Sequence, residues 1–173
     1  SSRAPADGGC MLTIYGDSIS GNCHKVKFVC DRLGIPYRWI EVDILKGETR
    51  TPDFLAMNPA GQVPTVMLDD GRALAQSNAI MLYLAEGSDL IPADAFDRAL
   101  MNQWLFWEQY SHETAIAVRR YHAHILKKAD EEIDPALIGK GERALGVMEG
   151  HLAARRYFVG EKLTLADLAL VAY

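Results

Sequence analysis

The stretch MLTIYGDSISGNCHKVKFVCDRLGIPYRWIEV, residues 11–42, decides the fold. Residues 11–15 are a short apolar run that predicts a buried strand, and a Gly-Asp pair ends it. Apolar side chains then recur at helical spacing until Gly34-Ile35-Pro36 stops the helix, at Val26, Val29, Cys30 and Leu33. Residues 37–42 alternate like a second strand. A strand, a helix and a strand in about thirty residues predict a βαβ unit with parallel strands.

The next forty residues extend this unit with short elements. We expect a polar loop, a short helix over residues 52–57, a strand over 63–68, an Asp-Gly hairpin turn at 69–72, a return strand at 73–74 and a helix over 77–85. The predicted order is therefore βαβ, α, ββ, α. Residues 87–92, Gly-Ser-Asp-Leu-Ile-Pro, have the composition of a linker.

Beyond the linker the pattern is all-helical. A long helix is predicted from about Ala95 to Lys128, with one broad apolar stripe formed by Leu100, Trp104, Trp107, Tyr110, Ala117 and Tyr121. A second helix follows over 135–153. Thr164 and Asp167 form a capping-box-like start to a third. That apolar helix reaches Tyr173 within barely two turns, which favours a truncated chain. We predict a leader (1–10), an α/β domain (11–86), a linker (87–94) and a helical domain (95–173).

Composition narrows the classes of function. The chain has 173 residues, 49% of them hydrophobic, and a formal charge of -5, which excludes disorder and argues against nucleic acid or anionic membranes as partners. No apolar run approaches the ~18–20 residues that cross a bilayer, and the polar N-terminus has no signal-peptide core. The chain has three cysteines, Cys10, Cys23 and Cys30. They are few and odd in number, so they cannot form a disulfide framework, and we expect a reducing, cytoplasmic compartment.

Ser20 stands between the first predicted strand and its helix. In an open α/β layer, ligands bind outside the carboxyl ends of the strands, where the following helix presents unpaired N–H groups and about half a positive charge. A thiolate is the anion that gains most from this position, because an ordinary thiol is only a few per cent ionised at pH 7. Ser20 is equally suited to capping the helix alone, and its position does not separate the two interpretations.

Cys23 lies three residues after Ser20. The spacing is that of a redox Cys-x-x-Cys pair whose first cysteine is replaced by serine, so a self-contained dithiol cycle is excluded. Cys23 and Cys30 share the apolar stripe of the helix, which favours core packing for both.

A second group of motifs follows the short helix. Pro64 at the first residue of a strand leaves the ladder intact, and a cis Val63–Pro64 bond would leave the Val63 backbone groups free for an extended ligand. Gln76-Ser77 opens a helix, where the Ser77 hydroxyl and nearby N–H groups suit a carboxylate. Taken singly, these signals also fit an ordinary hairpin and N-cap.

Taken together, these features resemble the glutathione S-transferase family, in its serine-type, bacterial-like cytosolic classes. They are the element order, the serine between strand and helix, Gly61-Gln62-Val63-Pro64, Gln76-Ser77-Asn78-Ala79-Ile80 and Thr164-Leu165-Ala166-Asp167. The resemblance spans residues 11–173. It implies an α/β N-terminal thioredoxin-like domain that binds glutathione and an all-α C-terminal domain that supplies most of the second-substrate pocket.

The resemblance also implies roles near the glutathione sulfur. Ser20 matches the serine that hydrogen-bonds this sulfur. Asn22 lies in a stretch similar to a bacterial branch with glutathione-dependent disulfide reductase activity, whose asparagine contacts the sulfur. Val63, beside a cis Pro64, matches the residue that pairs with the cysteinyl backbone of glutathione.

Further residues match the ends of the tripeptide. Gln76 and Ser77 look like the clamp on the γ-glutamyl end, although Gln76 replaces the acidic residue common there. Gln62 and Thr49 or Arg50 occupy positions near the glycyl carboxylate, and Trp107 and Tyr110 are candidates for the second-substrate pocket.

The first hypothesis is therefore an enzyme of detoxification that stabilises the glutathione thiolate for attack on a small hydrophobic electrophile. The alternatives are a glutathione-dependent disulfide reductase or peroxidase, and a non-catalytic transferase-like binding module. The resemblance implies a homodimer with glutathione as co-substrate. Zinc-type ligand spacing and phosphate-binding glycine loops are missing, so no metal or nucleotide is expected.

Overall fold

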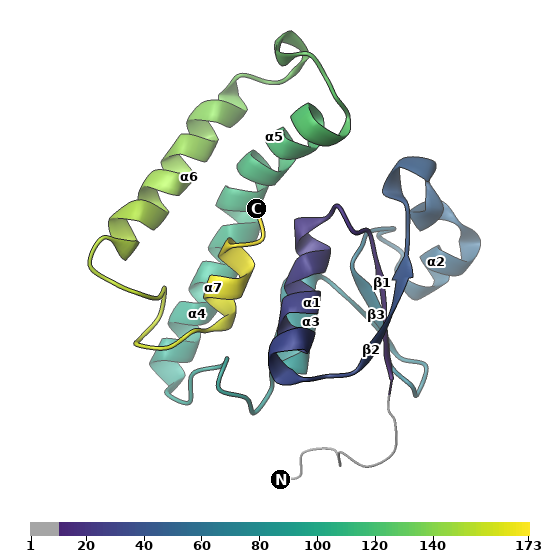
Figure 1. Ribbon diagram of the computed structural model, residues 1–173, viewed down its shortest axis with the longest axis horizontal. Coiled ribbons are helices and arrows are strands. Elements are labelled where there is room, and N and C mark those ends of the chain that lie inside the picture. Colours follow the sequence, from purple (N-terminus) through teal and green to yellow (C-terminus); the bar gives the residue numbers. More distant parts are fainter. Residues whose placement is uncertain (1–10) are drawn as a thin grey trace. The chain divides into compact units, whose positions relative to one another are not determined.

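The computed structural model describes residues 11–173, so the predicted leader and Cys10 lie outside the described residues (Figure 1). The chain divides into two compact units between Ile91 and Pro92. Among residues 11–173, no helix has the length and apolar character needed to cross a membrane.

The N-terminal unit is a mixed four-stranded sheet with helices. Its elements are β1 (Leu12–Gly16), α1 (Gly21–Leu33), β2 (Tyr37–Glu41), η1 (Ile44–Lys46), η2 (Glu48–Arg50), α2 (Pro52–Met57), β3 (Thr65–Met67), β4 (Ala73–Ala75) and α3 (Ser77–Leu84). The strand order is β2-β1-β3-β4, with β1 parallel to β2 and the other pairs antiparallel. The predicted order of elements and the parallel βαβ unit are confirmed.

The alternating side chains of β1 attach helices to both faces of the sheet. Ile14 faces α1 and α3, which lie together on one side of the sheet in Figure 1. The core on that side consists of Leu12, Ile14, Val26, Cys30, Val66 and Ile80. Tyr15 points to the other face, where its ring meets that of Phe54 on α2 edge-on at 6.5 Å between centroids. The sheet therefore forms the middle layer of this unit.

Local signals set the ends of the elements. Gly34 ends α1 in the left-handed conformation at φ 65°, and its N–H bonds to the carbonyls of Asp31 and Cys30. The Val63–Pro64 bond is cis, as predicted. The predicted strand 63–68 is shorter in the structure, because ladder pairing begins only at Thr65, after this proline.

The C-terminal unit is helical. Its elements are α4 (Ala95–Trp107), η3 (Glu108–Ala117), α5 (Val118–Arg120), η4 (Tyr121–Ile125), η5 (Asp130–Glu132), α6 (Ala136–Leu152) and α7 (Leu165–Leu170). The prediction of one regular helix to Lys128 is wrong: the helical turns end at Ile125, and η3 and η4 are π-helical. The Thr114 hydroxyl bonds to the Tyr110 carbonyl at 2.8 Å and competes for an acceptor within these wide turns.

The wide turns also overturn part of the predicted apolar stripe. Trp104 is buried as expected, but Tyr110 is 85% exposed. Glu108 and His112, four residues apart, take buried positions instead. A π-turn closes with a longer hydrogen-bonded ring than an α-turn and so contains more residues. The residues that face the core therefore differ from those that α-helical spacing predicts.

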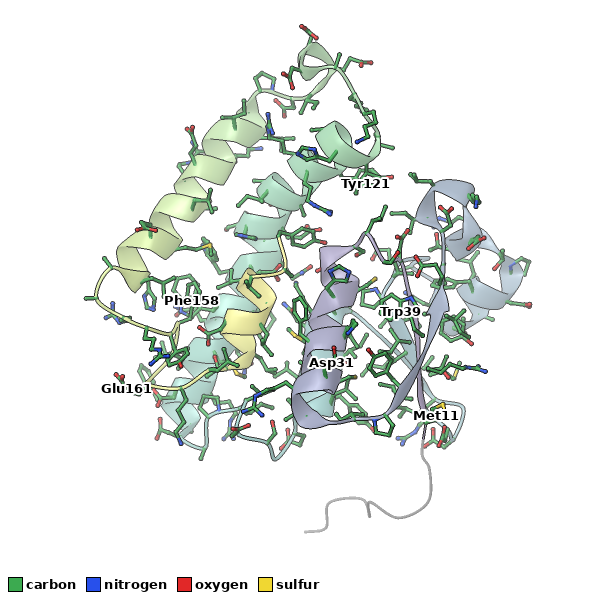
Figure 2. All side chains as sticks on the ribbon, viewed as in Figure 1. Met11, Asp31, Trp39, Tyr121, Phe158 and Glu161 are labelled. Atoms are coloured by element: carbon green, nitrogen blue, oxygen red, sulfur yellow. The ribbon has the colours of Figure 1, made fainter. Side chains whose placement is uncertain are left out.

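Aromatic packing and one capping box hold this unit together. The Trp104 ring lies 4.8 Å from the rings of both His151 and Phe158, and Phe158 is labelled in Figure 2 on the segment that joins α6 to α7. The predicted capping box of α7 is confirmed, since Asp167 accepts from the Thr164 N–H at 2.8 Å. Asp167 also accepts from the Phe158 N–H at 3.0 Å, which ties this segment to α7.

Candidate functional site

The turn between β1 and α1 presents one hydroxyl at the start of a helix. Ser20 is the N-cap of α1, is half-buried, and accepts from the Cys23 N–H at 3.4 Å. A hydroxyl has one proton and two lone pairs, so accepting this bond does not use the Ser20 proton, and the hydroxyl also makes a side-chain hydrogen bond with Cys23. The first turn of α1 holds no acidic residue, so no carboxylate there competes with a bound anion.

The buried carboxylate of Asp17 holds the turn that carries Ser20. Asp17 is 4% exposed, and its two oxygens accept from the N–H groups of Ile19 at 3.0 Å and Ile44 at 3.1 Å. Its backbone carbonyl accepts from the Ser20 N–H at 3.0 Å. Asp17 therefore joins the turn that carries Ser20 to the segment after β2.

A second carboxylate, Glu41, holds the outer part of the same turn. It accepts from the Ser18 N–H at 2.8 Å and from the Trp39 indole at 2.6 Å. Burial raises the pKa of Glu41, but these hydrogen bonds outweigh it and hold that pKa below its ordinary value. Trp39, labelled in Figure 2, needs Gly16 beside it, because a Cβ there would lie 2.7 Å from its ring.

The sequence patterns did not identify either carboxylate as a residue of this site. Asp17 directly follows β1 and Glu41 ends β2. The carboxyl ends of two parallel strands meet at the same edge of a sheet, so acidic residues at both ends were the available signal.

Cys23 confirms the core-packing interpretation. Its side chain is completely buried, and burial raises its pKa to about 11, against smaller lowering effects of hydrogen bonds from Ser20 and the Asp17 N–H. The charges of Asp17 and Glu41 raise that pKa further. Cys30 is also fully buried, and burial raises its pKa to about 12. Both residues are protonated thiols at neutral pH.

The starts of α1 and α3 are joined by side chains. The Ser77 hydroxyl donates to Asn22 Oδ1 at 3.2 Å, so the structure brings together two residues expected to contact glutathione. Gln76, immediately before α3, is exposed, has φ 71° and makes no side-chain cap. The N-terminus of α3 is therefore not closed by its own N-cap side chain.

Val63 lies on an open stretch of backbone. Within residues 11–173, no backbone hydrogen bond engages the N–H or carbonyl of Val63. Its neighbour Gln62 is held in place, because the Asn58 amide donates to the Gln62 carbonyl at 2.9 Å and to the Thr65 hydroxyl at 3.2 Å. The Gln62 side chain itself is exposed.

Arg50 and Thr49 differ in their access to solvent. Thr49 is buried, whereas Arg50 is exposed, and its Nη1 donates to the Ala60 carbonyl at 3.5 Å. Arg50 lies across Gly61, where a Cβ would come 2.7 Å from its Nη1. The structure therefore brings Arg50, rather than the Thr49 side chain, to the exposed segment that carries Gln62.

The remaining predicted residues belong to the helical unit. Trp107 is half-buried and packs edge-on against Trp104 at 5.2 Å between centroids, while Tyr110 is exposed. In the same unit a groove of about 500 Å³ separates η3 and α5 from α6. Among residues 11–173, no three His, Cys, Asp or Glu side chains gather to hold a metal ion.

The raised Cys23 pKa predicts a loss of stability at alkaline pH. Below pH 9 the thiol is protonated in both the folded and unfolded states, and its contribution is complete. As pH rises from 9 through about 11, the unfolded state loses the proton first, so the free energy of unfolding falls. We expect the wild type to lose up to about 1.4 kcal/mol per pH unit more than Cys23→Ala in this range.

Urea unfolding of both proteins at several pH values, with reductant present, measures this difference. The Cys23→Ala variant is the reference for the wild type, because all other titrating groups are the same in the two proteins. Parallel pH profiles would contradict the assignment of Cys23 as a buried neutral thiol.

Comparison with known proteins agrees with the fold. Residues 19–86 match the family Glutathione S-transferase, N-terminal domain, and residues 106–173 match Glutathione S-transferase, C-terminal domain. Glutathione S-transferase 3 of Zea mays is 33% identical over 165 residues, which cover 90% of this chain and 73% of that protein.

Solved structures give the same result. A glutathione S-transferase from Pseudomonas fluorescens is 45% identical with a TM-score of 0.92, over 94% of this chain and 82% of that one. One from Xanthobacter autotrophicus is also 45% identical, with a TM-score of 0.89 over 94% of this chain and 80% of that one. The sheet-and-helix architecture, both domain matches and these relatives agree, and the chain belongs to the glutathione S-transferase family.

Proposed function

We propose that Ser20 and the N-terminus of α1 stabilise the thiolate of glutathione, the co-substrate of this transferase. An ordinary thiol has a pKa near 8.5, and lowering it by about two units requires about 2.7 kcal/mol. A charge-assisted hydrogen bond contributes ~1.5–3 kcal/mol and a helix N-terminus ~0.3–1 kcal/mol. The Ser20 hydroxyl, at the N-cap of a helix without acidic residues in its first turn, is the observation that carries this proposal.

The nearby carboxylates oppose a thiolate less than their formal charges suggest. Asp17 accepts two backbone N–H groups, and Glu41 accepts one N–H and an indole. These donors offset part of each negative charge locally. Both carboxylates support the turn through the backbone, while the Ser20 side chain is the group left to meet a ligand.

The rest of the tripeptide fits an extended path over the N-terminal unit. The unpaired backbone groups of Val63 suit the cysteinyl residue, and the uncapped start of α3, with Gln76 and Ser77, suits the γ-glutamyl end. Arg50, with Gln62 beside it, suits the glycyl carboxylate. An exposed arginine there supplies a local cation in a chain whose net charge is -5.

Conjugation is the reaction that this arrangement favours. The attacking sulfur belongs to glutathione, so the protein supplies orientation and electrostatic stabilisation rather than a nucleophile. Cys23 and Cys30 are buried protonated thiols and are unsuited to a disulfide-exchange step. We assign the second substrate to a small hydrophobic electrophile, with Trp107 and Tyr110 as the aromatic candidates of the helical unit. The matches to named transferases favour an enzyme over a non-catalytic module.

Removing the Ser20 hydroxyl tests the assignment. We expect Ser20→Ala to lower kcat/KM for conjugation of glutathione to a chlorodinitroarene by about 10- to 150-fold, the kinetic equivalent of a lost charge-assisted bond. Ser20→Thr keeps a hydroxyl and should retain more activity. Ser18→Ala is the matched control, because this exposed serine lies in the same turn and the variant keeps the backbone bonds to Glu41 and His24, losing only a side-chain hydrogen bond to Glu41.

Two outcomes would contradict conjugation through Ser20. Full activity of Ser20→Ala would remove the hydroxyl from the reaction. Faster turnover of a small organic disulfide than of the chloroarene, lost in Asn22→Ala, would instead favour the glutathione-dependent reductase.

We also propose that the protein is a cytoplasmic homodimer. Two free buried thiols suit a reducing compartment. Large apolar side chains remain exposed on α6, where Ile138, Leu145 and Val147 are each about half-exposed, and the first two line the groove of the helical unit. Sedimentation velocity should give twice the chain mass at micromolar concentration, and Leu145→Glu should shift it toward the monomer. A wild-type monomer would contradict the dimer.

A further inference from the structure

His24 is the fourth residue of α1, and its side chain bonds back to the turn that carries Ser20. The ring nitrogen Nε2 lies 2.9 Å from the Ser18 carbonyl oxygen. A carbonyl oxygen has no proton to donate, so Nε2 carries the proton of this bond. Side chains on a helix point toward its N-terminus, which brings the imidazole back to the residues before α1. The ring therefore joins the helix to the turn.

The backbone of His24 holds a second carbonyl of the same turn. Its N–H donates to the Ser20 carbonyl at 3.1 Å, so one residue engages the carbonyls of both Ser18 and Ser20. The two carboxylates of the site bind groups of the opposite kind, because Asp17, after β1, and Glu41, on β2, accept N–H groups of this turn. The turn is thus held by acceptors at the strand ends and by donors from α1.

The Ser18 carbonyl is close enough to act on an anion at Ser20. Consecutive Cα atoms are 3.8 Å apart, so the Cα atoms of Ser18 and Ser20 are separated by at most about 7.6 Å. At such a distance the negative end of a carbonyl dipole opposes a thiolate, and an N–H group that donates to the carbonyl offsets its partial charge. The His24 bond therefore acts in the same direction as the positive end of α1.

We infer that His24 is a positioning residue for the thiolate of glutathione, acting through the Ser18 carbonyl and the turn that presents the Ser20 hydroxyl. The Nε2–H group holds the turn against α1 and offsets the negative end of the carbonyl. This inference rests on the proposed function, because it takes the glutathione sulfur to lie at Ser20. It assigns the effect to the proton on Nε2 rather than to the packing of the ring.

Variants of His24 separate the N–H group from the ring. His24→Phe keeps an aromatic ring beside Phe28, whose centroid lies 6.0 Å from that of the imidazole, but it has no donor. In His24→Gln the amide nitrogen is as many bonds from Cα as Nε2 is, so it can donate to the same carbonyl. The amide nitrogen of His24→Asn is one bond closer to Cα and falls short. Phe28→Leu is the matched control, because it removes the ring contact and keeps the hydrogen bond.

The measured quantity is the pH midpoint at which the thiol of bound glutathione ionises, followed by its ultraviolet difference spectrum. We expect His24→Phe to raise this midpoint by about 0.5–1 pH unit, the effect of one lost hydrogen bond. At saturating glutathione, kcat/KM for the chlorodinitroarene should fall about three- to tenfold near pH 5.5. It should stay within about twofold near pH 9, where the thiolate forms in every variant.

The other variants distinguish the bond from the fold. His24→Asn should reproduce the shift, which keeps the test decisive where His24→Phe folds poorly. His24→Gln should recover most of the wild-type midpoint, and Phe28→Leu should leave it unchanged.

The outcomes separate this inference from the proposed function. An unchanged midpoint in His24→Phe would overturn the inference, and so would a shift that His24→Gln does not reverse. An equal loss of activity at both pH values, or the same shift in Phe28→Leu, would reveal a purely structural role of the ring and overturn it as well. A wild-type midpoint equal to that of free glutathione would instead defeat the proposed function itself.

Discussion

The positive end of α1, closed by the Ser20 hydroxyl, is the interaction on which the account of this protein depends. A helix N-terminus in water is a weak source of potential, because solvent satisfies its N–H groups and screens its charge. Here the turn before the helix is fixed by bonds to Asp17 and Glu41, so the Ser20 hydroxyl is held in one place. Preorganisation of this kind lets one neutral side chain stabilise a charge without reorganising when the ligand binds.

The N-terminal unit separates its charges according to what they bind. The carboxylates that follow β1 and end β2 accept backbone and indole N–H groups of the loop around Ser20. The buried Lys25 donates to Asn78 in the first turn of α3. Because Ser20 caps α1 and Asn22 in its first turn bonds to Ser77, this helix connects the proposed sulfur position with the start of α3.

Much of this architecture follows from the sequence. Period-two and helical apolar patterns, Gly34 after a helix and the Thr164–Asp167 pair each predicted an element or boundary that the structure confirms. Local rules succeed there because each feature is decided within one or two turns of chain. The two buried cysteines follow in the same way, from their place on an apolar stripe.

Features set by contacts between distant segments were not predictable in this way. Nothing local marks Lys25 as buried, and its amine donates to Asn78, a residue 53 positions away. The functions of Asp17 and Glu41 depend on the parallel pairing of β1 with β2. In the wide turns after Trp107, Tyr110 is exposed and Glu108 is buried, because their π-helical period differs from the α-helical one used for the prediction.

The thiol pKa of glutathione bound to the wild-type protein is the most direct test of the central claim. It is measured from the ultraviolet difference spectrum of the complex against pH, since the thiolate absorbs where the thiol does not. The account predicts a midpoint about two pH units below the ordinary thiol value of ~8.5. A midpoint unchanged from that of free glutathione would contradict it, because the corner at Ser20 would then give the sulfur no stabilisation.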